Sequence, residues 1–154
     1  YFDPFDQKKY TPYVIETSIG LDRMFLAVFS QSLNIEKLDD GTQRTVLKIP
    51  IILASNKCAI LPLVKKDGLP EIATNLKDKL KLKYNVIYDE KDAIGKRYRR
   101  QDAIGTPYCI TIDHQTNQDK TITIRERDSM EQKRISVENV ESFLSESFDI
   151  SNWL

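Results

Sequence analysis

The run Cys58–Val64 is apolar at every position, and it constrains the fold of this chain more than any other feature. A strand with one solvated face alternates apolar and polar residues, whereas a continuous apolar run is typical of a strand buried on both faces. Gly68 and Pro70 follow it, and proline suits the first turn of a helix. Apolar residues at helical spacing between Ile72 and Leu80 give that helix one apolar face. A doubly buried strand followed by an amphipathic helix predicts an α/β fold.

The alternation of strands and helices continues toward the C-terminus. Strands are predicted over residues 85–88, 107–113, 121–125 and 133–135, and the polar residues 114–120 predict a turn. A polar helix is predicted over residues 92–102, and Ser136 is a plausible N-cap of a last helix. Strand–helix–strand units favour parallel pairing, while residues 121–125 alternate as an antiparallel strand does. We therefore predict a mixed sheet of five strands, parallel plus antiparallel, with about three helices.

The first third of the chain has a different organisation. Residues 12–16 predict a short strand, and apolar residues recur at helical spacing from Leu21 to about Leu33. Residues 34–44 are polar and include the turn signal Asp39-Asp40-Gly41, which predicts a linker or surface loop. One strand and one helix cannot close a core, so the apolar stripe of this helix needs a partner. We expect three parts: residues 1–36, a linker over residues 37–50, and a domain over residues 51–154.

The composition excludes several classes of protein. With 40% hydrophobic and 30% charged residues in a chain of 154, the protein is globular rather than disordered. Its apolar runs are too short to span a membrane. The two cysteines lie far apart and lack the paired spacing of a zinc site, which favours reduced, buried thiols in a cytoplasmic protein. The single histidine, His114, lies in a polar stretch, and the sequence shows no nucleophile–base pair and no glycine-rich phosphate loop.

The charged residues are balanced in number but unevenly spread. Equal counts of 23 cations and 23 anions argue against a uniformly basic nucleic-acid binder. Four cations nevertheless surround Tyr98 in one short segment, namely Lys96, Arg97, Arg99 and Arg100. Arginine binds phosphates and base edges with fork geometry, and tyrosine stacks on unpaired bases. Most charge runs are only solvated helix faces, but Lys65-Lys66 and Arg125/Arg127 lie near strand ends, where α/β sheets bind ligands. The pattern favours a polyanion on one face.

A second candidate site lies in Glu16–Arg23. The predicted strand delivers the Glu16 carboxylate and the Ser18 hydroxyl, and Arg23 falls in the first turn of the predicted helix. This arrangement suits an ammonium ligand at Glu16 and a phosphate at Arg23. A surface arginine and a strand-end glutamate are also common without any ligand.

The motif Glu16-x-Ser18-x-Gly20-x-x-Arg23 resembles the third signature motif of class II aminoacyl-tRNA synthetases, in the form found in glycyl-tRNA synthetases. The later stretches 59–70, 94–109 and 123–132 are similar to the C-terminal anticodon-binding domain of that family, which belongs to subclass IIa. The resemblance covers nearly the whole chain in the right order. Two departures are Thr17, where the family usually has proline, and the absence of the first two class II motifs. We therefore expect the C-terminal part of a longer enzyme, in which residues 1–36 are a strand–helix remnant of the catalytic domain and the domain from residue 51 binds the anticodon.

The resemblance implies an activity and its site residues. The parent enzyme would activate glycine with ATP and Mg²⁺, transfer it to tRNA(Gly), and form a homodimer, whereas this chain alone would be inactive and would hold no cofactor. Arg23 would contact the ATP phosphates, and Glu16 and Ser18 would recognise glycine. Residues expected to contact the anticodon loop are Lys96, Arg97, Arg99 and Arg100, supported by Arg125 and Arg127. Asp102 either accepts a hydrogen bond from a cytosine amino group or pairs with a neighbouring arginine.

Three alternatives remain open at the level of sequence. One is a non-catalytic, synthetase-like accessory protein that binds RNA or DNA. Another is an α/β domain for protein interaction with a solvated basic helix. The third is the anticodon domain of a sister synthetase specific for proline, threonine or histidine.

Overall fold

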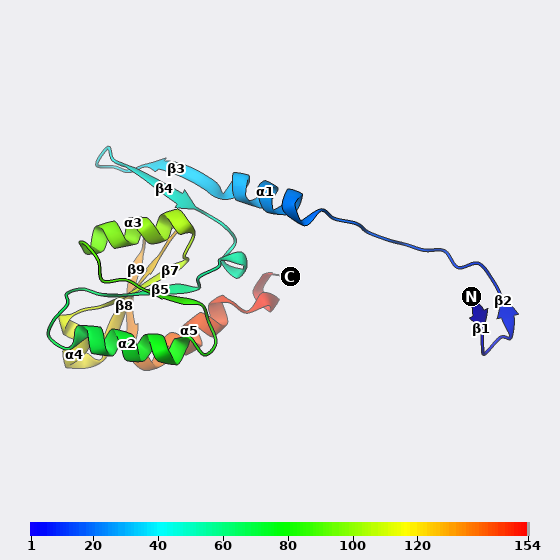
Figure 1. The fold of residues 1–154 in the computed structure, drawn as a ribbon. Coiled ribbons are helices and arrows are strands. Elements are labelled where there is room, and N and C mark those ends of the chain that lie inside the picture. The colour runs from blue at the N-terminus through cyan, green and yellow to red at the C-terminus, as the bar shows by residue number, and fades with distance from the viewer. Residues whose placement is uncertain (154) are drawn as a thin grey trace.

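The computed structural model describes residues 1–153, with side chains up to residue 151, and its centre is a five-stranded sheet (Figure 1). The strands lie in the order β6-β5-β7-β8-β9. Their bounds are Cys58–Pro62 for β5, Val86–Tyr88 for β6, Tyr108–Ile112 for β7, Thr121–Glu126 for β8 and Gln132–Ser136 for β9. β5 pairs in parallel with β6 and β7, while β7–β8 and β8–β9 are antiparallel. The mixed five-stranded sheet predicted from the sequence is confirmed.

Helices cover both faces of this sheet (Figure 1). On one face, α2 (Leu69–Leu80) and α5 (Val140–Ser147) pack on the main core. On the other face, α3 (Ile94–Ile104) packs on a smaller core that includes Ala59, Leu61 and Cys109. Successive side chains of a strand point to opposite faces, so the fully buried run of β5 supplies residues to both cores.

The predicted turn over residues 114–120 is wrong, because His114–Asp119 forms a short helix, α4. The Asp113 carboxylate accepts a hydrogen bond from the Thr116 N–H at 3.2 Å, and the Thr116 hydroxyl accepts one from the Asp113 N–H at 3.1 Å. This reciprocal cap stabilises a helix of six residues in a polar stretch. Ser136 acts as an N-cap as predicted, since its hydroxyl accepts from the Glu138 N–H ahead of the short 3₁₀ turn Val137–Asn139 that leads into α5.

The N-terminal part extends away from the sheet (Figure 1). It contains two short paired strands, β1 (Phe2–Asp3) and β2 (Lys8–Lys9), and then the helix α1 (Leu21–Ser32). The predicted strand over residues 12–16 is wrong: residues 10–20 form neither helix nor strand. A strand needs a neighbour for its backbone hydrogen bonds, and none of the described strands pairs with these residues.

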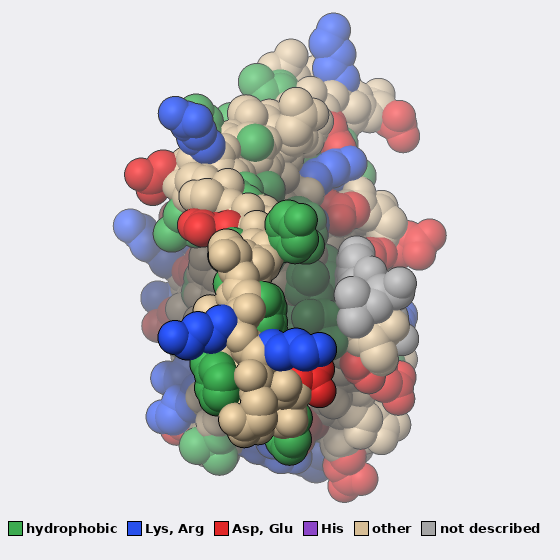
Figure 2. All heavy atoms as spheres, turned by 90° about the vertical axis from the view of Figure 1, so that its right-hand side faces the viewer, with side chains coloured by type: hydrophobic (Ala, Val, Ile, Leu, Met, Phe, Trp, Pro, Cys, Tyr) green, Lys and Arg blue, Asp and Glu red, His purple; other side chains and the backbone are tan. Residues whose placement is uncertain are grey.

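The apolar stripe of α1 is exposed along most of its length. The exposed fraction is 50% for Met24, 65% for Phe25 and 37% for Phe29. Viewed from the side on which the N-terminal segment projects, hydrophobic side chains lie at the surface between cationic and anionic ones (Figure 2). The partner that the sequence pattern requires for this helix is therefore not among the described residues.

The linker or surface loop predicted over residues 34–44 is wrong, because most of these residues lie in the two strands of a hairpin. β3 (Leu33–Lys37) follows α1 directly and pairs with β4 (Gln43–Leu47) in an antiparallel hairpin. The sequence pattern did not predict β4, because one of its two buried positions holds Arg44, and arginine usually lies at the surface. The short 3₁₀ turn Ile51–Leu53 then leads to the sheet. The division of the chain into three domains at these boundaries stays a prediction.

Two further findings concern residues 1–153 only. No helix among them is long and apolar enough to cross a membrane. They also hold no group of three or more His, Cys, Asp or Glu side chains placed to bind a metal ion.

Candidate nucleic-acid interface

The basic helix α3 lies with one face on the sheet and the other toward solvent. Ile94, Tyr98 and Gln101 recur at helical spacing and pack inward. Lys96 lies on the opposite side and is exposed, and the side chains of Arg99 and Arg100 are 42% and 41% exposed. The helix therefore divides the cations of one short segment between the interior and the surface.

Arg97, which was predicted to contact the anticodon loop, lies in the interior. It is 3% exposed, and its guanidinium donates to the backbone carbonyls of Pro62 at 2.6 Å and Leu63 at 3.1 Å. Its Nε has no hydrogen-bond partner among the described residues. Arg97 thus holds α3 against the end of β5.

Asp102 is fully buried and pairs with arginines, the second of the two roles predicted for it. Its carboxylate accepts two hydrogen bonds from Arg125 at 2.8 and 3.1 Å. It also accepts from Arg44 of β4 at 3.2 Å and from Arg99 at 3.5 Å. Arg125 is 4% exposed, and its guanidinium stacks on the Tyr98 ring at 4.9 Å from the centroid. One buried carboxylate therefore connects α3, β8 and the hairpin.

Arg127 is also in the interior, although the sequence predicted a supporting contact with RNA. Its guanidinium donates to the carbonyls of Gly105 and Ile49, both at 2.9 Å, and to the Asp128 carboxylate. The residue is 2% exposed. Buried charges are stable only when they are paired and hydrogen-bonded, and Arg127 satisfies this condition.

The three exposed cations of α3 differ in how firmly they are held. Arg100 donates to Asp89 at 2.7 and 3.1 Å and to Asp92 at 2.9 Å, so its guanidinium is already engaged. Among the described residues, Arg99 makes weaker contacts, namely a 3.5 Å contact with Asp102, a 3.9 Å contact with the Met130 sulfur and a longer-range attraction to Asp40. Lys96 makes no ion pair or side-chain hydrogen bond within the described part of the chain. Lys96 and Arg99 are therefore the cations most available to an external anion.

Two hollows lie beside these cations. We call the first the α3 groove; it has a volume of about 420 Å³ and is lined by Gln43, Arg44, Thr45, Lys96, Arg99, Arg100 and Ala103. We call the second the Tyr98 pocket; it has a volume of about 360 Å³ and is lined by Gly95, Lys96, Tyr98, Arg99, Arg125, Met130 and Gln132. Lys96 and Arg99 line both hollows, so the groove and the pocket form one continuous basic surface along α3.

The Tyr98 pocket combines a stacked ring with polar groups. The Tyr98 hydroxyl is 2.7 Å from the Thr111 hydroxyl, and burial raises the pKa of the Tyr98 phenol, so it stays neutral at physiological pH. Met130 supplies an adaptable apolar wall, and the Gln132 amide offers both a donor and an acceptor. The sequence patterns did not single out Gln43, Thr45, Met130 or Gln132, because an uncharged side chain in a polar loop or edge strand carries no distinctive signal.

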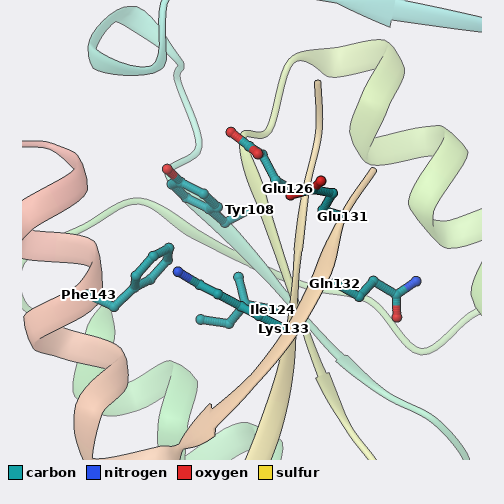
Figure 3. Close-up of a pocket in the computed structure, with 7 residues that line it drawn as sticks. All are labelled: Tyr108, Ile124, Glu126, Glu131, Gln132, Lys133 and Phe143. Carbon is teal, nitrogen blue, oxygen red and sulfur yellow. The ribbon is translucent and has the colours of Figure 1, made fainter. Parts of the chain in front are cut away.

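A third hollow lies on the opposite face of the sheet (Figure 3). It has a volume of about 200 Å³, and the Lys133 ammonium points at the Phe143 ring, 4.0 Å from its centroid. Two carboxylates, Glu126 and Glu131, stand at its rim. Because these carboxylates repel phosphate, this hollow does not suit a polyanion.

The second candidate site is placed apart from α3. Glu16 and Ser18 lie in the exposed segment 10–20, and Arg23 lies in the first turn of α1. None of the three makes an ion pair or side-chain hydrogen bond with another described residue. The structure therefore leaves these side chains accessible but does not assemble them into a pocket.

Comparison with known proteins identifies the class of this domain. The sequence profile of the anticodon-binding domain matches residues 57–147, and the chain belongs to that family. It is similar to the glycine–tRNA ligase of Clostridium acetobutylicum, with 50% identity over 95% of this chain and 31% of that protein. It is also similar to the glycine–tRNA ligase of Borreliella burgdorferi, with 49% identity over 94% of this chain and 32% of that protein. The resemblance to glycyl-tRNA synthetases is confirmed, and the chain spans about a third of the length of these curated relatives.

Solved structures show the same fold at lower sequence identity. A prolyl-tRNA synthetase from Cryptosporidium parvum, in complex with L-proline and AMP, matches 67% of this chain and 22% of that chain with a TM-score of 0.62 and 19% identity. The RNA-binding domain of threonyl-tRNA synthetase from Cryptosporidium parvum Iowa II matches 65% of this chain and 25% of that chain, with a TM-score of 0.58 and 21% identity. The fold is therefore that of anticodon-binding domains in class II synthetases.

Proposed function

We propose that this domain binds the anticodon loop of tRNA(Gly) along α3, as part of a glycine–tRNA ligase. The observation that carries the proposal is that Lys96 and Arg99, the least engaged cations of α3, line both the α3 groove and the Tyr98 pocket. Family membership and the similarity to glycine–tRNA ligases support the choice of ligand.

The two hollows have different roles in this proposal. Lys96, Arg99 and Arg100 bind phosphates of the loop along the α3 groove, which supplies affinity but little sequence discrimination. The Tyr98 pocket receives an unstacked base, because single-stranded RNA is recognised by bases that leave the stack. In this position the Gln132 amide hydrogen-bonds the base edge. Arg97, Arg125, Arg127 and Asp102 do not contact RNA but fix the positions of α3 and β8.

The remaining activities belong to the parent enzyme in this proposal. It activates glycine with ATP and Mg²⁺, charges tRNA(Gly), forms a homodimer and works in the cytoplasm. Arg23 binds the ATP phosphates and Glu16 and Ser18 bind glycine, which fits their exposure and their freedom from partners among residues 1–153. The described residues contain no acidic cluster for a metal, so the proposal assigns no Mg²⁺ ligand to them.

The test measures RNA binding by this chain with fluorescence anisotropy. The probe is a labelled stem-loop with the anticodon loop of tRNA(Gly), titrated at about 50 mM and about 200 mM salt, a range over which phosphate contacts lose much of their affinity. The variant Lys96→Glu/Arg99→Glu should bind more weakly, and the slope of log affinity against log salt should fall by about 0.7 for each phosphate contact that is lost. A stem-loop with exchanged anticodon bases should bind more weakly to the wild-type chain.

The matched control is Lys79→Glu/Lys81→Glu, in the last turn and at the C-cap of α2, which makes the same change of charge on the opposite face of the sheet (Figure 1). This control should leave both the affinity and the salt slope unchanged. Equal weakening by the α2 and α3 variants would show attraction by net charge alone and would refute the site. Preference for the loop of a proline, threonine or histidine tRNA would assign the domain to a sister synthetase.

A further inference from the structure

The β3–β4 hairpin lies outside the residues matched by the anticodon-binding family, 57–147, yet it packs on α3. In Figure 1 it runs along the side of α3 that faces away from the sheet. The contact is tight where α3 ends. Gly105 has φ +82°, and a Cβ there would lie 3.1 Å from atoms of Leu47 and Ile49. A side chain at Gly105 would therefore push the hairpin away from the helix.

Arg44 attaches the hairpin through a buried network of charges. It is 2% exposed and donates to Asp102 of α3 at 3.2 Å and to the carbonyl of Arg127 at 2.8 Å. Within the hairpin it donates to Glu36 at 2.6 Å. These hydrogen bonds fix the Arg44 guanidinium and, with it, the strand that carries Arg44. The hairpin is therefore held in a defined position relative to α3.

The residues on either side of Arg44 line the α3 groove. Arg44 and Val46 are buried, whereas Gln43 and Thr45 are exposed, as expected for alternate residues of a strand. Gln43 and Thr45 line the groove together with Lys96 and Arg99. An amide and a hydroxyl are hydrogen-bond donors for phosphate oxygens and for the ribose 2′-hydroxyl. One wall of the groove is thus cationic, and the exposed side chains of the other wall are neutral and polar.

The turn of the hairpin has the opposite chemistry. Asp39 and Asp40 line a separate hollow of about 710 Å³, which also includes Arg99. Their carboxylates repel phosphate, so a polyanion in the α3 groove is kept away from the turn. The charge pattern favours a path for an RNA backbone between β4 and the basic side of α3.

We propose that the β3–β4 hairpin is the second wall of the RNA-binding groove, where Gln43 and Thr45 contact the sugar–phosphate backbone and Arg44 is a positioning residue that holds this wall against α3. This inference rests on the proposed binding of RNA along α3, and its test separates the two. It extends the RNA-binding surface to residues that precede the family match.

The test is protection of an introduced thiol from alkylation. The native thiols, Cys58 and Cys109, are 0% and 1% exposed, so in the folded protein only an introduced cysteine reacts. Thr45→Cys places a thiol on the groove wall. Ile35→Cys is the matched control, because Ile35 lies directly opposite Thr45 in the register but on the outer strand, and it does not line the groove. The probe is the same anticodon stem-loop of tRNA(Gly).

The expected degree of protection follows from the fraction of the protein that is bound to RNA. At about ten times its dissociation constant the RNA leaves about one tenth of the protein free, so a covered thiol should react about tenfold more slowly. The thiol at position 45 should show this protection, and the thiol at position 35 should not. If the thiol at position 45 is alkylated at the same rate with and without bound RNA, the hairpin is not a wall of the RNA-binding groove, while the proposed function stays intact. A wild-type chain that binds no RNA would overturn both.

The positioning role of Arg44 is tested in the Thr45→Cys background. Arg44→Gln removes the charge that attaches the hairpin, so protection at position 45 should be lost, whereas Arg44→Lys keeps the charge and should restore part of it. If Cys58 and Cys109 are not alkylated during labelling, the variant is still folded. Full protection at position 45 in a folded Arg44→Gln variant would refute the positioning role.

Discussion

Loss of the buried Asp102 carboxylate is predicted to destabilise this domain strongly. It has no exposed surface and is the shared acceptor for Arg44 and Arg125, which are 2% and 4% exposed. Asp102→Asn keeps the shape of the side chain but removes its charge. Arg44 retains Glu36 as a counter-ion, whereas among the described residues Arg125 retains only the Tyr98 ring and a neutral amide. The variant therefore leaves one guanidinium buried without a compensating charge.

The expected loss can be worked from the cost of breaking a buried ion pair. Removal of one partner destabilises a protein by about 3–5 kcal/mol, because the remaining charge stays desolvated and unpaired. A domain of this size has a free energy of unfolding of about 5–15 kcal/mol, so the loss is a large part of the total. With a urea m-value of about 2 kcal/mol per M, the unfolding midpoint should fall by about 1.5–2.5 M.

Urea unfolding followed by circular dichroism measures this shift, with Asp92→Asn as the control. Asp92 also pairs with an arginine, Arg100, at 2.9 Å, but both side chains are about two-fifths exposed. An exposed pair contributes about 0–1 kcal/mol, so the control midpoint should move by less than about 0.5 M. If Asp102→Asn shifts the midpoint no more than Asp92→Asn does, the network is not a stabilising element and the reasoning fails.

Two further predictions concern titratable groups. Burial raises the pKa of the Cys58 and Cys109 thiols to about 12, so neither should react with iodoacetamide at pH 8 until urea unfolds the chain; rapid labelling of the folded protein would contradict the burial. The Arg134 guanidinium, hydrogen-bonded to Asp113 at 2.7 Å, holds the pKa of this carboxyl below its ordinary value of 3.8. A depressed pKa stabilises the fold above that ordinary value, and the contribution is lost as pH falls through the folded pKa. The variant Asp113→Asn removes the charge but keeps an N-cap acceptor. The difference in stability between wild type and this variant should therefore shrink below about pH 4 in acid-unfolding curves. A difference that stays constant with pH would show that the Arg134–Asp113 ion pair is not the source of the stabilisation.

The regular elements of the domain could be predicted because their signals are local. The apolar run at Cys58, the proline at the start of α2 and the alternation of β8 are each contained within a few residues. The elements that were not predicted, such as α4 and β4, have polar residues at positions where an apolar residue usually marks a helix or a strand in the sequence. The capping pair Asp113 and Thr116 made a helix from a polar stretch, and Arg44 occupied a buried position in a strand that read as a linker.

The candidate site was predicted in outline only. The segment around Tyr98 was identified from its charge, and Lys96, Arg99 and Arg100 do reach the surface. Arg97, Arg125 and Arg127 are of the same residue type, and nothing local distinguishes them from Arg99. Their burial depends on acceptors in other elements, such as the carbonyl of Pro62 for Arg97.

The sequence by itself determined the five strands of the mixed sheet, the helices α2, α3 and α5 between and after them, and the position of the basic segment, because periodicity and charge are properties of neighbouring residues. Only the tertiary structure decided which charges face solvent and which hold the fold together. Asp102 meets Arg44 across 58 residues and Arg125 across 23 residues, and such pairs form only when separate elements pack. The free energy of a charged side chain depends on whether packing leaves it in water or gives it a buried partner, and no local pattern contains that information.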